Sequence, residues 1–185
     1  MNHKSSKPIV SEGEVLIFPA RTPEVSGKRM HFVFSALQIE DILKETTIHS
    51  VPLCPIFSEG IAEWRGRVLP VISLEACLGL VTPTLPESQR LIVVRTPKKL
   101  DSQSVESKGI LIVSSAVRKI KLPIPCMPFE SNEMFTDNTL LRGVFEWEED
   151  LLIVVDMEKI LSGENEIAIP NELGSIRHRE AMVAS

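Results

Sequence analysis

The chain has 185 residues, of which 43% are hydrophobic and 24% charged, so it is large enough to bury the core of one domain or of two small ones. Its 20 basic and 25 acidic residues leave a net charge of −5, which excludes the broad positive field that binding to nucleic acid requires. Cys54, Cys77 and Cys126 are too widely spaced for a CxxC metal site and odd in number, which argues against a disulfide framework and favours a reducing cytoplasm.

At the N-terminus, residues 1–13 are polar and lack the apolar core of a signal peptide, so we expect them to be flexible. No stretch of the sequence approaches the roughly 20 consecutive apolar residues of a membrane span. The sequence therefore predicts a cytoplasmic protein without direct membrane insertion.

From residue 14 onward, strand patterns dominate. Short runs rich in Val, Ile, Leu and Phe alternate with turn residues, which is typical of an all-β fold built from small barrels. The predicted strands are 14–19, 30–35, 60–64, 67–72, 90–95, 109–114, 118–122, 141–147 and 151–155. Helical spacing is confined to three short segments, 37–44, 74–80 and 157–161.

Three polar segments fall outside these elements. Residues 21–28 and 97–108 are predicted to be exposed hairpin loops, because they combine Pro or Gly with Ser and charged residues. Residues 162–185 show only weak amphipathic spacing, so a mobile tail and a single helix both fit them. The folded part is therefore expected to span residues 14–161.

The chain repeats itself, because residues 60–78 align with residues 143–161 without a gap. Gly, Glu, Trp, Val, Glu and Leu recur in register along the two copies. Each copy predicts a strand that ends at Trp, a tight polar turn, a hydrophobic strand and a short helix. Ser73 and Asp156 precede the two helices and are residue types that cap helix N-termini. One chain therefore carries two related β subdomains.

The two copies differ at the turn that follows Trp64 and Trp147. Arg65 and Gly66 stand in the first copy where the second has the acidic residues 148–150. This opposite charge leaves open whether one turn meets a partner or whether both are purely structural. Each Trp fits either core packing or a contact with a partner.

No motif of a catalytic or metal centre is present. The four histidines lack ligand-like spacing, and the HExxH, GxSxG, Walker and GxGxxG patterns are absent. Cys54 and Cys77 are interpreted as small apolar fillers, whereas the role of Cys126 stays open. Glu63 and Glu146 are interpreted as charges on the solvent side of a strand. We therefore predict a protein that is not an enzyme.

Five separated blocks of this sequence resemble the CheW family of chemotaxis coupling proteins, in family order. They are 39–43, 51–55, 60–74, 109–113 and 141–161. The resemblance implies two SH3-like, five-stranded β-barrels packed on a common hydrophobic core, which agrees with the internal repeat. It also implies a non-catalytic adaptor that joins the cytoplasmic tip of chemoreceptors to the CheW-like regulatory domain of the histidine kinase CheA.

The resemblance further implies where these partners bind. The kinase is expected on the first barrel, at Gln38, Ile39 and Asp41. Receptor contacts are expected in the groove between the barrels, at Gly60, Arg65, Leu91 and Gly109. No cofactor and no metal is implied. The protein is expected in the cytoplasm, recruited to membrane-associated receptor arrays.

Two alternatives to this function stay open, and the first rests on departures from the family pattern. Ser73 and Ser114 stand where the family often has Asp, which is compatible with an adaptor of a non-flagellar pathway, for type IV pilus twitching motility or for second-messenger control. The third hypothesis is a small-molecule-binding protein with a site between the barrels, suggested by Cys54, Cys126 and the two Trp residues.

Overall fold

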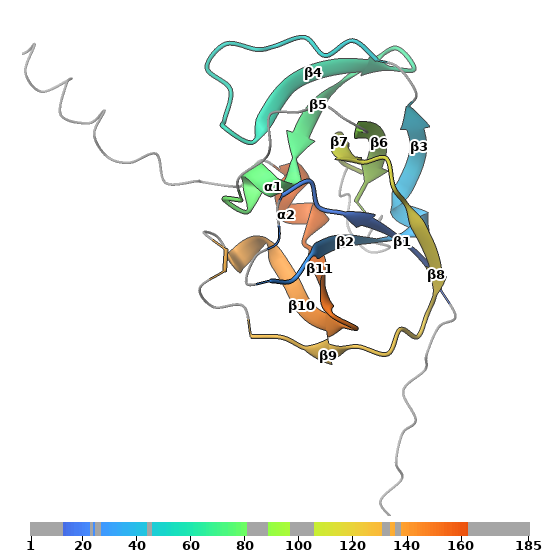
Figure 1. Cartoon of the computed structure of the whole chain (residues 1–185). Helices are drawn as coiled ribbons and strands as arrows, with labels where there is room; N and C mark the ends of the chain where they lie inside the picture. The colour runs from blue at the N-terminus through green and yellow to red at the C-terminus, as the bar shows by residue number, and fades with distance from the viewer. Residues whose placement is uncertain are drawn as a thin grey trace, which may run out of the picture.

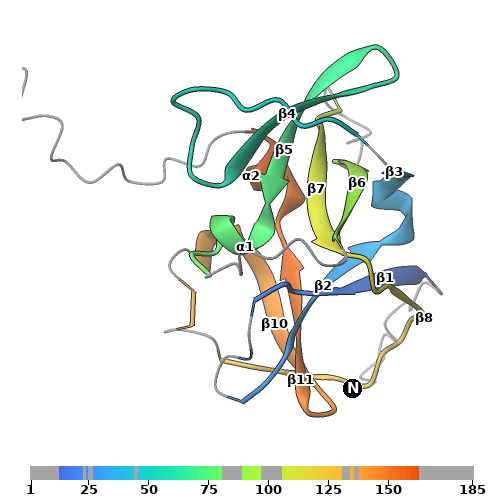
Figure 2. The same ribbon diagram turned by 45° about the horizontal axis from the view of Figure 1, so that its top comes forward.

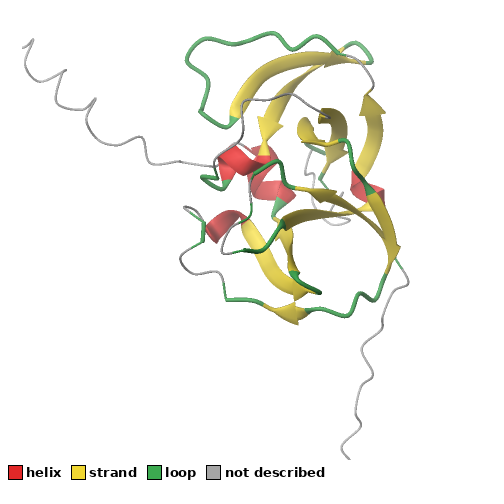
Figure 3. Cartoon of the chain, viewed as in Figure 1, coloured by secondary structure: helices red, strands yellow, loops and turns green. Residues whose placement is uncertain are grey.

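Two β-sheets packed on a shared core make up the computed structural model, and its helices are few and short (Figure 1, Figure 3). The structure describes residues 13–22, 24, 27–43, 46–80, 89–96, 106–130, 134–135 and 138–162. The strands are β1 (Glu14–Pro19), β2 (Met30–Ser35), β3 (Ile39–Leu43), β4 (Ser58–Trp64), β5 (Arg67–Ser73), β6 (Gln89–Arg95), β7 (Lys108–Ser114), β8 (Arg118–Lys121), β9 (Met127–Pro128), β10 (Leu141–Trp147) and β11 (Asp150–Val155). The helices are the 3-10 helices η1 (Ala36–Gln38) and η2 (Asn138–Leu140) and the α-helices α1 (Leu74–Cys77) and α2 (Met157–Ser162).

The middle of the chain forms one sheet and the flanking segments form the other. The five-stranded sheet has the order β3-β6-β7-β5-β4, and the six-stranded sheet has the order β8-β1-β2-β11-β10-β9. In Figure 2 the five-stranded sheet lies above the six-stranded one. The predicted mostly β fold is therefore confirmed, with a sixth strand, β9, in the second sheet. The SH3-like closure of each barrel stays a prediction.

The internal repeat has the same structure in both copies. β4 and β5 pair antiparallel, as do β10 and β11, and each pair has a register shift at its glycine, Gly60 or Gly143. Ser73 Oγ accepts a hydrogen bond from the Ala76 amide, 3.3 Å away, and so caps α1 as predicted. In the second copy, Asp156 Oδ1 accepts from the Glu158 and Lys159 amides at the start of α2. The sequence duplication is thus a duplication of a folded unit.

The helix predicted over 37–44 is wrong. Ser35 and Gln38 do begin a helix, because the Ser35 side chain accepts from the Leu37 amide and the Gln38 side chain from the Ser35 amide. After one 3-10 turn, however, the chain becomes β3 and pairs antiparallel with β6. The apolar spacing imitated a helix, but tertiary strand pairing overrides local propensity.

The strand β9 was not predicted, because it has two residues and one is Pro128, which lacks the amide hydrogen of a normal strand residue. The segment predicted as a loop at 97–108 does join an antiparallel pair, since Arg95 of β6 lies opposite Lys108 of β7. Residues 97–105 themselves lie outside the described residues, as do parts of 21–28 and the whole of 1–12 and 163–185.

Three apolar clusters hold the two sheets. The largest combines side chains from both sheets and both α-helices, such as Phe32, Leu111 and Met157. The two smaller clusters lie one in each sheet and contain Trp64 and Trp147, which are 8% and 5% exposed. Both Trp residues are therefore core residues, which decides between the two interpretations left open by the sequence.

The predicted role of Cys77 as an apolar filler is confirmed, since it lies in the largest cluster. Burial, together with the nearby Glu75 carboxylate, raises the pKa of its thiol to about 12. A thiol with this pKa is neutral at physiological pH and is a poor nucleophile.

A buried ion pair connects the end of β1 to the start of α1. Arg21 Nη2 lies 2.8 Å from Glu75 Oε2, and the two side chains are 11% and 1% exposed. The Arg21 amide and Nε also donate to Glu75 Oε1, and Arg21 Nη2 donates to Ser73 Oγ at 2.9 Å. Because Arg21 follows a strand of the six-stranded sheet and Glu75 follows a strand of the other, this cluster ties the two sheets together.

We predict that Glu75→Ala lowers the free energy of unfolding by about 3 kcal/mol, because it leaves the buried Arg21 guanidinium without its partner. Urea denaturation followed by Trp fluorescence measures this change. The matched control is Glu63→Ala on the exposed side of β4, for which we expect a change within about 0.5 kcal/mol. Equal effects of the two substitutions would contradict the structural role of the pair.

Candidate functional site

The predicted kinase-binding residues lie together where the chain passes from one sheet to the other. Gln38 ends η1, and Ile39 and Asp41 follow on β3. Ile39 is half-buried and packs on the largest apolar cluster. The pairing of β3 with β6 shifts register between Ile39 and Asp41, so Glu40 is a bulge residue. The bulge changes the alternation of side chains at this point of the strand.

Asp41 is the centre of a small polar cluster with two residues of the β4–β5 hairpin. Its Oδ2 accepts a hydrogen bond from Trp64 Nε1 at 3.0 Å and one from Arg65 Nη2 at 3.2 Å. The Trp64 hydrogen bond is the largest influence that lowers the pKa of Asp41, and Arg65 adds to it. Asp41 is thus held as a carboxylate on the surface of the five-stranded sheet.

Arg65 combines this contact with high exposure. Its guanidinium lies 4.7 Å from the centre of the Trp64 ring, and 70% of its side chain is exposed. Its φ of 49° is in the left-handed region, as is that of Glu148 at the equivalent turn, with a φ of 56°. The second residues of the turns differ, because Gly66 has a φ of 73° whereas the φ of Glu149 is not positive. The two turns therefore differ in charge and, at that second residue, in backbone shape.

Predicted receptor and kinase residues meet in this cluster, since Asp41 was assigned to the kinase and Arg65 to the receptor. Beside them, Lys108 lies 5.5 Å from the Trp64 ring and donates to both carboxylate oxygens of Glu40, at 2.7 and 2.8 Å. The sequence did not indicate the Glu40–Lys108 pair, because the two residues are 68 positions apart in the chain.

The two glycines among the predicted receptor residues are buried. Gly60 has a φ of 131°, and a Cβ there would lie 2.3 Å from the His49 carbonyl oxygen. At Gly109 a Cβ would lie 2.6 Å from Leu161 Cδ2 of α2. Any part they have in binding is therefore through the shape of the backbone. Leu91 lies on β6, half-buried, beside the cluster that contains Trp64.

A groove of about 670 Å³ opens where the two sheets join. Most of its lining is apolar, with polar groups at Ser35, Gln38, Arg95, Thr96, Arg142 and Glu158. Apolar lining comes from β1, β2, β11, η1 and α2, including Val15, Val33, Leu37, Val154 and Met157. Of the predicted site residues, Gln38 lines this groove, and the four predicted receptor residues do not.

Sequence reasoning missed Leu37, which is 79% exposed beside the groove. The erroneous helix over 37–44 concealed it, because Leu37 was then counted toward an apolar helical face. Exposed large apolar side chains at a groove are typical of surfaces that dock other proteins. Leu37 therefore belongs with the candidate docking residues.

Within the described residues, no three His, Cys, Asp or Glu side chains lie close enough to hold a metal ion. His31 Nε2 lies 2.9 Å from Asp150 Oδ2, and Arg29 Nε donates a hydrogen bond to the other carboxylate oxygen of Asp150. Cys54 Sγ donates to the Ser58 carbonyl, and Cys126 lines a different, open hollow beside β9. The two cysteines therefore do not share the groove at the junction of the sheets. None of the described helices is long and apolar enough to cross a bilayer.

Comparisons with known proteins agree on one family. The family model described as the CheW-like domain matches residues 24–165. A probable chemotaxis protein CheW from Rhizobium etli is 24% identical over 133 residues, which are 71% of this chain and 80% of that protein. The crystal structure of the scaffolding protein TtCheW from Thermoanaerobacter tengcongensis superposes with a TM-score of 0.57 at 19% identity, covering 85% of this chain and 90% of that one.

We predict that Asp41 contributes to stability in a pH-dependent way. Because its pKa is lowered in the folded state, the contribution is present above the ordinary value of 3.8 and is lost as the pH falls through the lowered pKa. The difference in urea midpoint between the wild type and Asp41→Asn should therefore shrink as the solution is acidified below 3.8. A difference that stays constant, or grows, would contradict the Trp64–Asp41 hydrogen bond.

We also predict that Gly60→Ala destabilises the fold by at least about 2 kcal/mol, because its φ of 131° is strained for Ala and the new Cβ meets the His49 carbonyl. Gly66→Ala is the control. It has a φ of 73° but nothing within 4 Å of the added Cβ, so we expect a cost of about 1 kcal/mol. Thermal unfolding of both variants tests the order, and a reversed order would refute the close approach of His49.

Proposed function

We propose that this chain, which belongs to the CheW-like domain family, is a non-catalytic adaptor that couples chemoreceptors to the histidine kinase CheA in a bacterial chemosensory array. The observation that carries the proposal is the presence of two candidate docking surfaces on one tightly packed scaffold. One is the exposed cluster of Asp41 and Arg65, and the other is the apolar groove beside Leu37. The names of its relatives, a chemotaxis protein and a scaffolding protein, support the same role.

The kinase arm is proposed at Gln38, Ile39 and Asp41. Half-buried Ile39 offers apolar area, and the carboxylate of Asp41 offers a charge that fixes the register of a docked domain. The bulge at Glu40 favours this use of β3, since bulges re-aim side chains. The regulatory domain of CheA is the proposed partner.

The receptor arm is proposed at Arg65 and Leu91, and the buried glycines Gly60 and Gly109 are proposed to contribute only through the shape of the backbone. The groove at the junction of the sheets contains none of these four residues, but its largely apolar lining suits one face of an amphipathic helix, and we propose it as a separate receptor contact. Arg95 and Arg142 stand at the edge of that groove. We therefore propose that the cytoplasmic tip of a receptor supplies a helix with an apolar stripe. The adaptor would act in the cytoplasm, recruited to receptor arrays at the membrane.

The same mechanism fits an adaptor of a non-flagellar chemosensory pathway. Ser73, which departs from the family pattern, is hydrogen-bonded by Arg21 within the cluster that ties the sheets together. In this chain the Ser73 hydroxyl therefore takes part in the contact between the sheets at a position where the family often has Asp. Pilus genes rather than flagellar genes beside the gene for this chain would favour twitching motility as the output.

We predict that the two partners bind directly to the charged side chains of Asp41 and Arg65. Arg65→Glu should weaken binding to receptor fragments at least about tenfold, and Asp41→Arg should weaken binding to the CheA regulatory domain similarly, because each inverts a charge offered to the partner. The swap of both residues, Asp41→Arg with Arg65→Asp, restores the attraction within the chain but still presents inverted charges. Both partners should therefore bind the swap poorly in titration calorimetry.

Arg118→Glu is the matched control, because Arg118 stacks 4.7 Å from the Trp147 ring as Arg65 does on Trp64. We expect it to bind both partners like the wild type. If the swap variant binds both partners as well as the wild type, the attraction between residues 41 and 65 matters for binding and the charge that each presents to a partner does not. Failure of the wild-type chain to bind either partner would end the adaptor proposal.

A further inference from the structure

The strand β3 lies at the edge of its sheet, and burial of its side chains does not fix its register. None of its five residues is buried. The register of a strand is strongly specified only where one face is buried, and a slip by one residue turns every side chain to the other face. Because Ile39 and Asp41 lie on β3, whatever fixes its register also fixes how these two side chains are presented.

The bulge at Glu40 brings two neighbouring carboxylates to the same place. Successive side chains of a regular strand point to opposite faces. Here Asp41 accepts a hydrogen bond from Trp64 Nε1, and Glu40 accepts from Lys108, whose Nζ lies 5.5 Å from the centre of the Trp64 ring. Both carboxylates therefore contact groups at this ring, which a bulge permits because it sets one residue outside the regular ladder.

Lys108 is enclosed by its contacts. Its side chain is only 15% exposed, and its Nζ lies 2.7 and 2.8 Å from the two carboxylate oxygens of Glu40 and 3.4 Å from Glu106 Oε2. An ammonium group is costly to bury unless acidic groups pair with it, and these two acids do so. Most of the surface of Lys108 is therefore used within the chain, so its effect on a partner would pass through the residues that it holds.

The strand ends that carry Lys108 are fixed in place. Lys108 of β7 lies opposite Arg95 of β6, and Arg95 Nη1 lies 2.9 Å from Glu106 Oε1. Just beyond them, the Thr96 amide donates to the Ser107 carbonyl at 2.9 Å, and the Ser107 amide donates to Thr96 Oγ1 at 3.1 Å. Figure 1 and Figure 2 show β6 and β7 side by side, with β3 at the other edge of β6. The ends of β6 and β7 are thus a fixed base to which Lys108 ties β3.

We propose that Lys108 is a positioning residue, which holds the bulge at Glu40 and so fixes the register at which β3 presents Ile39 and Asp41. The Trp64 hydrogen bond holds the residue after the bulge, and Lys108 holds the bulge residue itself. Without the ammonium group, the bulge is free to shift along β3, and a shift turns the residues that it passes to the other face. The effect of Lys108 on the kinase rests on the proposed function, whereas its effect on β3 can be measured in the chain alone.

Hydrogen exchange of the full-length chain tests the effect on β3. Lys108→Met keeps an unbranched side chain and removes the charge, so the amides of residues 39–43 should exchange several-fold faster, as expected for an edge strand without buried side chains. Lys108→Arg should restore slow exchange, because a guanidinium also donates to both oxygens of a carboxylate. Unchanged exchange of the β11 amides verifies that the core stays folded. Equal exchange of β3 in the wild type and in Lys108→Met would overturn the proposal.

A double-mutant cycle tests whether Lys108 acts through Glu40. Lys108→Met and Glu40→Ala should each weaken binding to the regulatory domain of CheA about fivefold. The double variant should bind at most about twofold more weakly than either single variant, because both substitutions remove the same contact. If Lys108 contacts the kinase directly, the two losses multiply in the double variant, and the positioning role is overturned.

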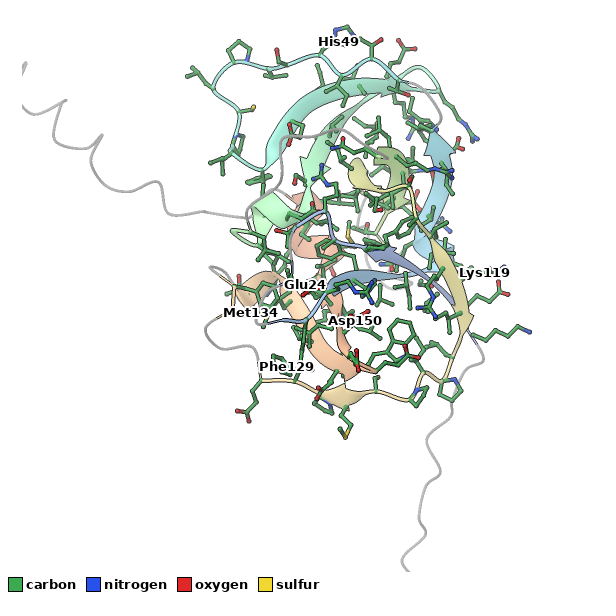
Figure 4. The ribbon with its side chains drawn as sticks, in the orientation of Figure 1. Glu24, His49, Lys119, Phe129, Met134 and Asp150 are labelled. Atoms are coloured by element: carbon green, nitrogen blue, oxygen red, sulfur yellow. The ribbon has the colours of Figure 1, made fainter. Side chains whose placement is uncertain are left out.

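Lys119 and Glu14 supply the matched control, because the same two side-chain types lie 2.8 Å apart there. Lys119 projects from β8 of the other sheet in Figure 4. Lys119→Met and Glu14→Ala should leave both kinase binding and the exchange of β3 unchanged, and equal losses in these variants would also overturn the proposal. If the wild-type chain does not bind the kinase domain but Lys108→Met still speeds exchange in β3, the adaptor proposal fails and the role of Lys108 in fixing β3 stands.

Discussion

Neither sheet of this protein can bury its apolar face alone, and the shared core between the sheets is the constraint on which the remaining structure depends. The largest cluster takes aromatic side chains from β1 and β2 and aliphatic ones from β6 and β7, with α1 and α2 completing it. Because the five-stranded unit is inserted between β2 and β8, the chain must leave the second sheet and return to it. The Arg21–Glu75 pair joins the β1–β2 connection to α1, and so adds directional hydrogen bonds between the sheets to the apolar contacts of the core.

Duplication explains the architecture, and divergence explains where function can reside. The copies keep the residues that a strand, turn, strand and cap require: a glycine at the register shift, a buried Trp before the turn, and Ser73 or Asp156 before the helix. They differ where no such requirement acts, at the turn of Arg65 and Glu148. Each turn places its first residue at a positive φ, so the backbone does not require Arg65 in one copy and Glu148 in the other, and this difference in charge can serve binding.

The sequence predicted most of the fold because its strands are short runs rich in Val, Ile, Leu and Phe with clear turns between them, even where, as in β7, both faces are buried. Nine strands and the two α-helices were found, since both copies of the repeat carry the same signals. The helix expected over 37–44 was wrong because the apolar residues of β3 do not alternate in the sequence as those of a typical strand do. This segment is a strand because it pairs with β6, and that pairing cannot be seen in the local sequence. The same dependence on distant partners hid the groove and the Glu40–Lys108 pair, for which no local signal exists.

The contact between Asp41 and Arg65 limits how strongly the two proposed arms can influence one another. An exposed ion pair contributes about 0 to 1 kcal/mol, because water screens the charges and the long side chain loses freedom when it is fixed. A partner that draws Arg65 away from Asp41 therefore changes the affinity of the other arm by less than about tenfold through this pair. The Trp64 hydrogen bond keeps Asp41 in place when Arg65 moves, since it comes from a buried ring on a rigid strand. These magnitudes favour a scaffold whose arms bind almost independently over a switch in which one partner controls the other.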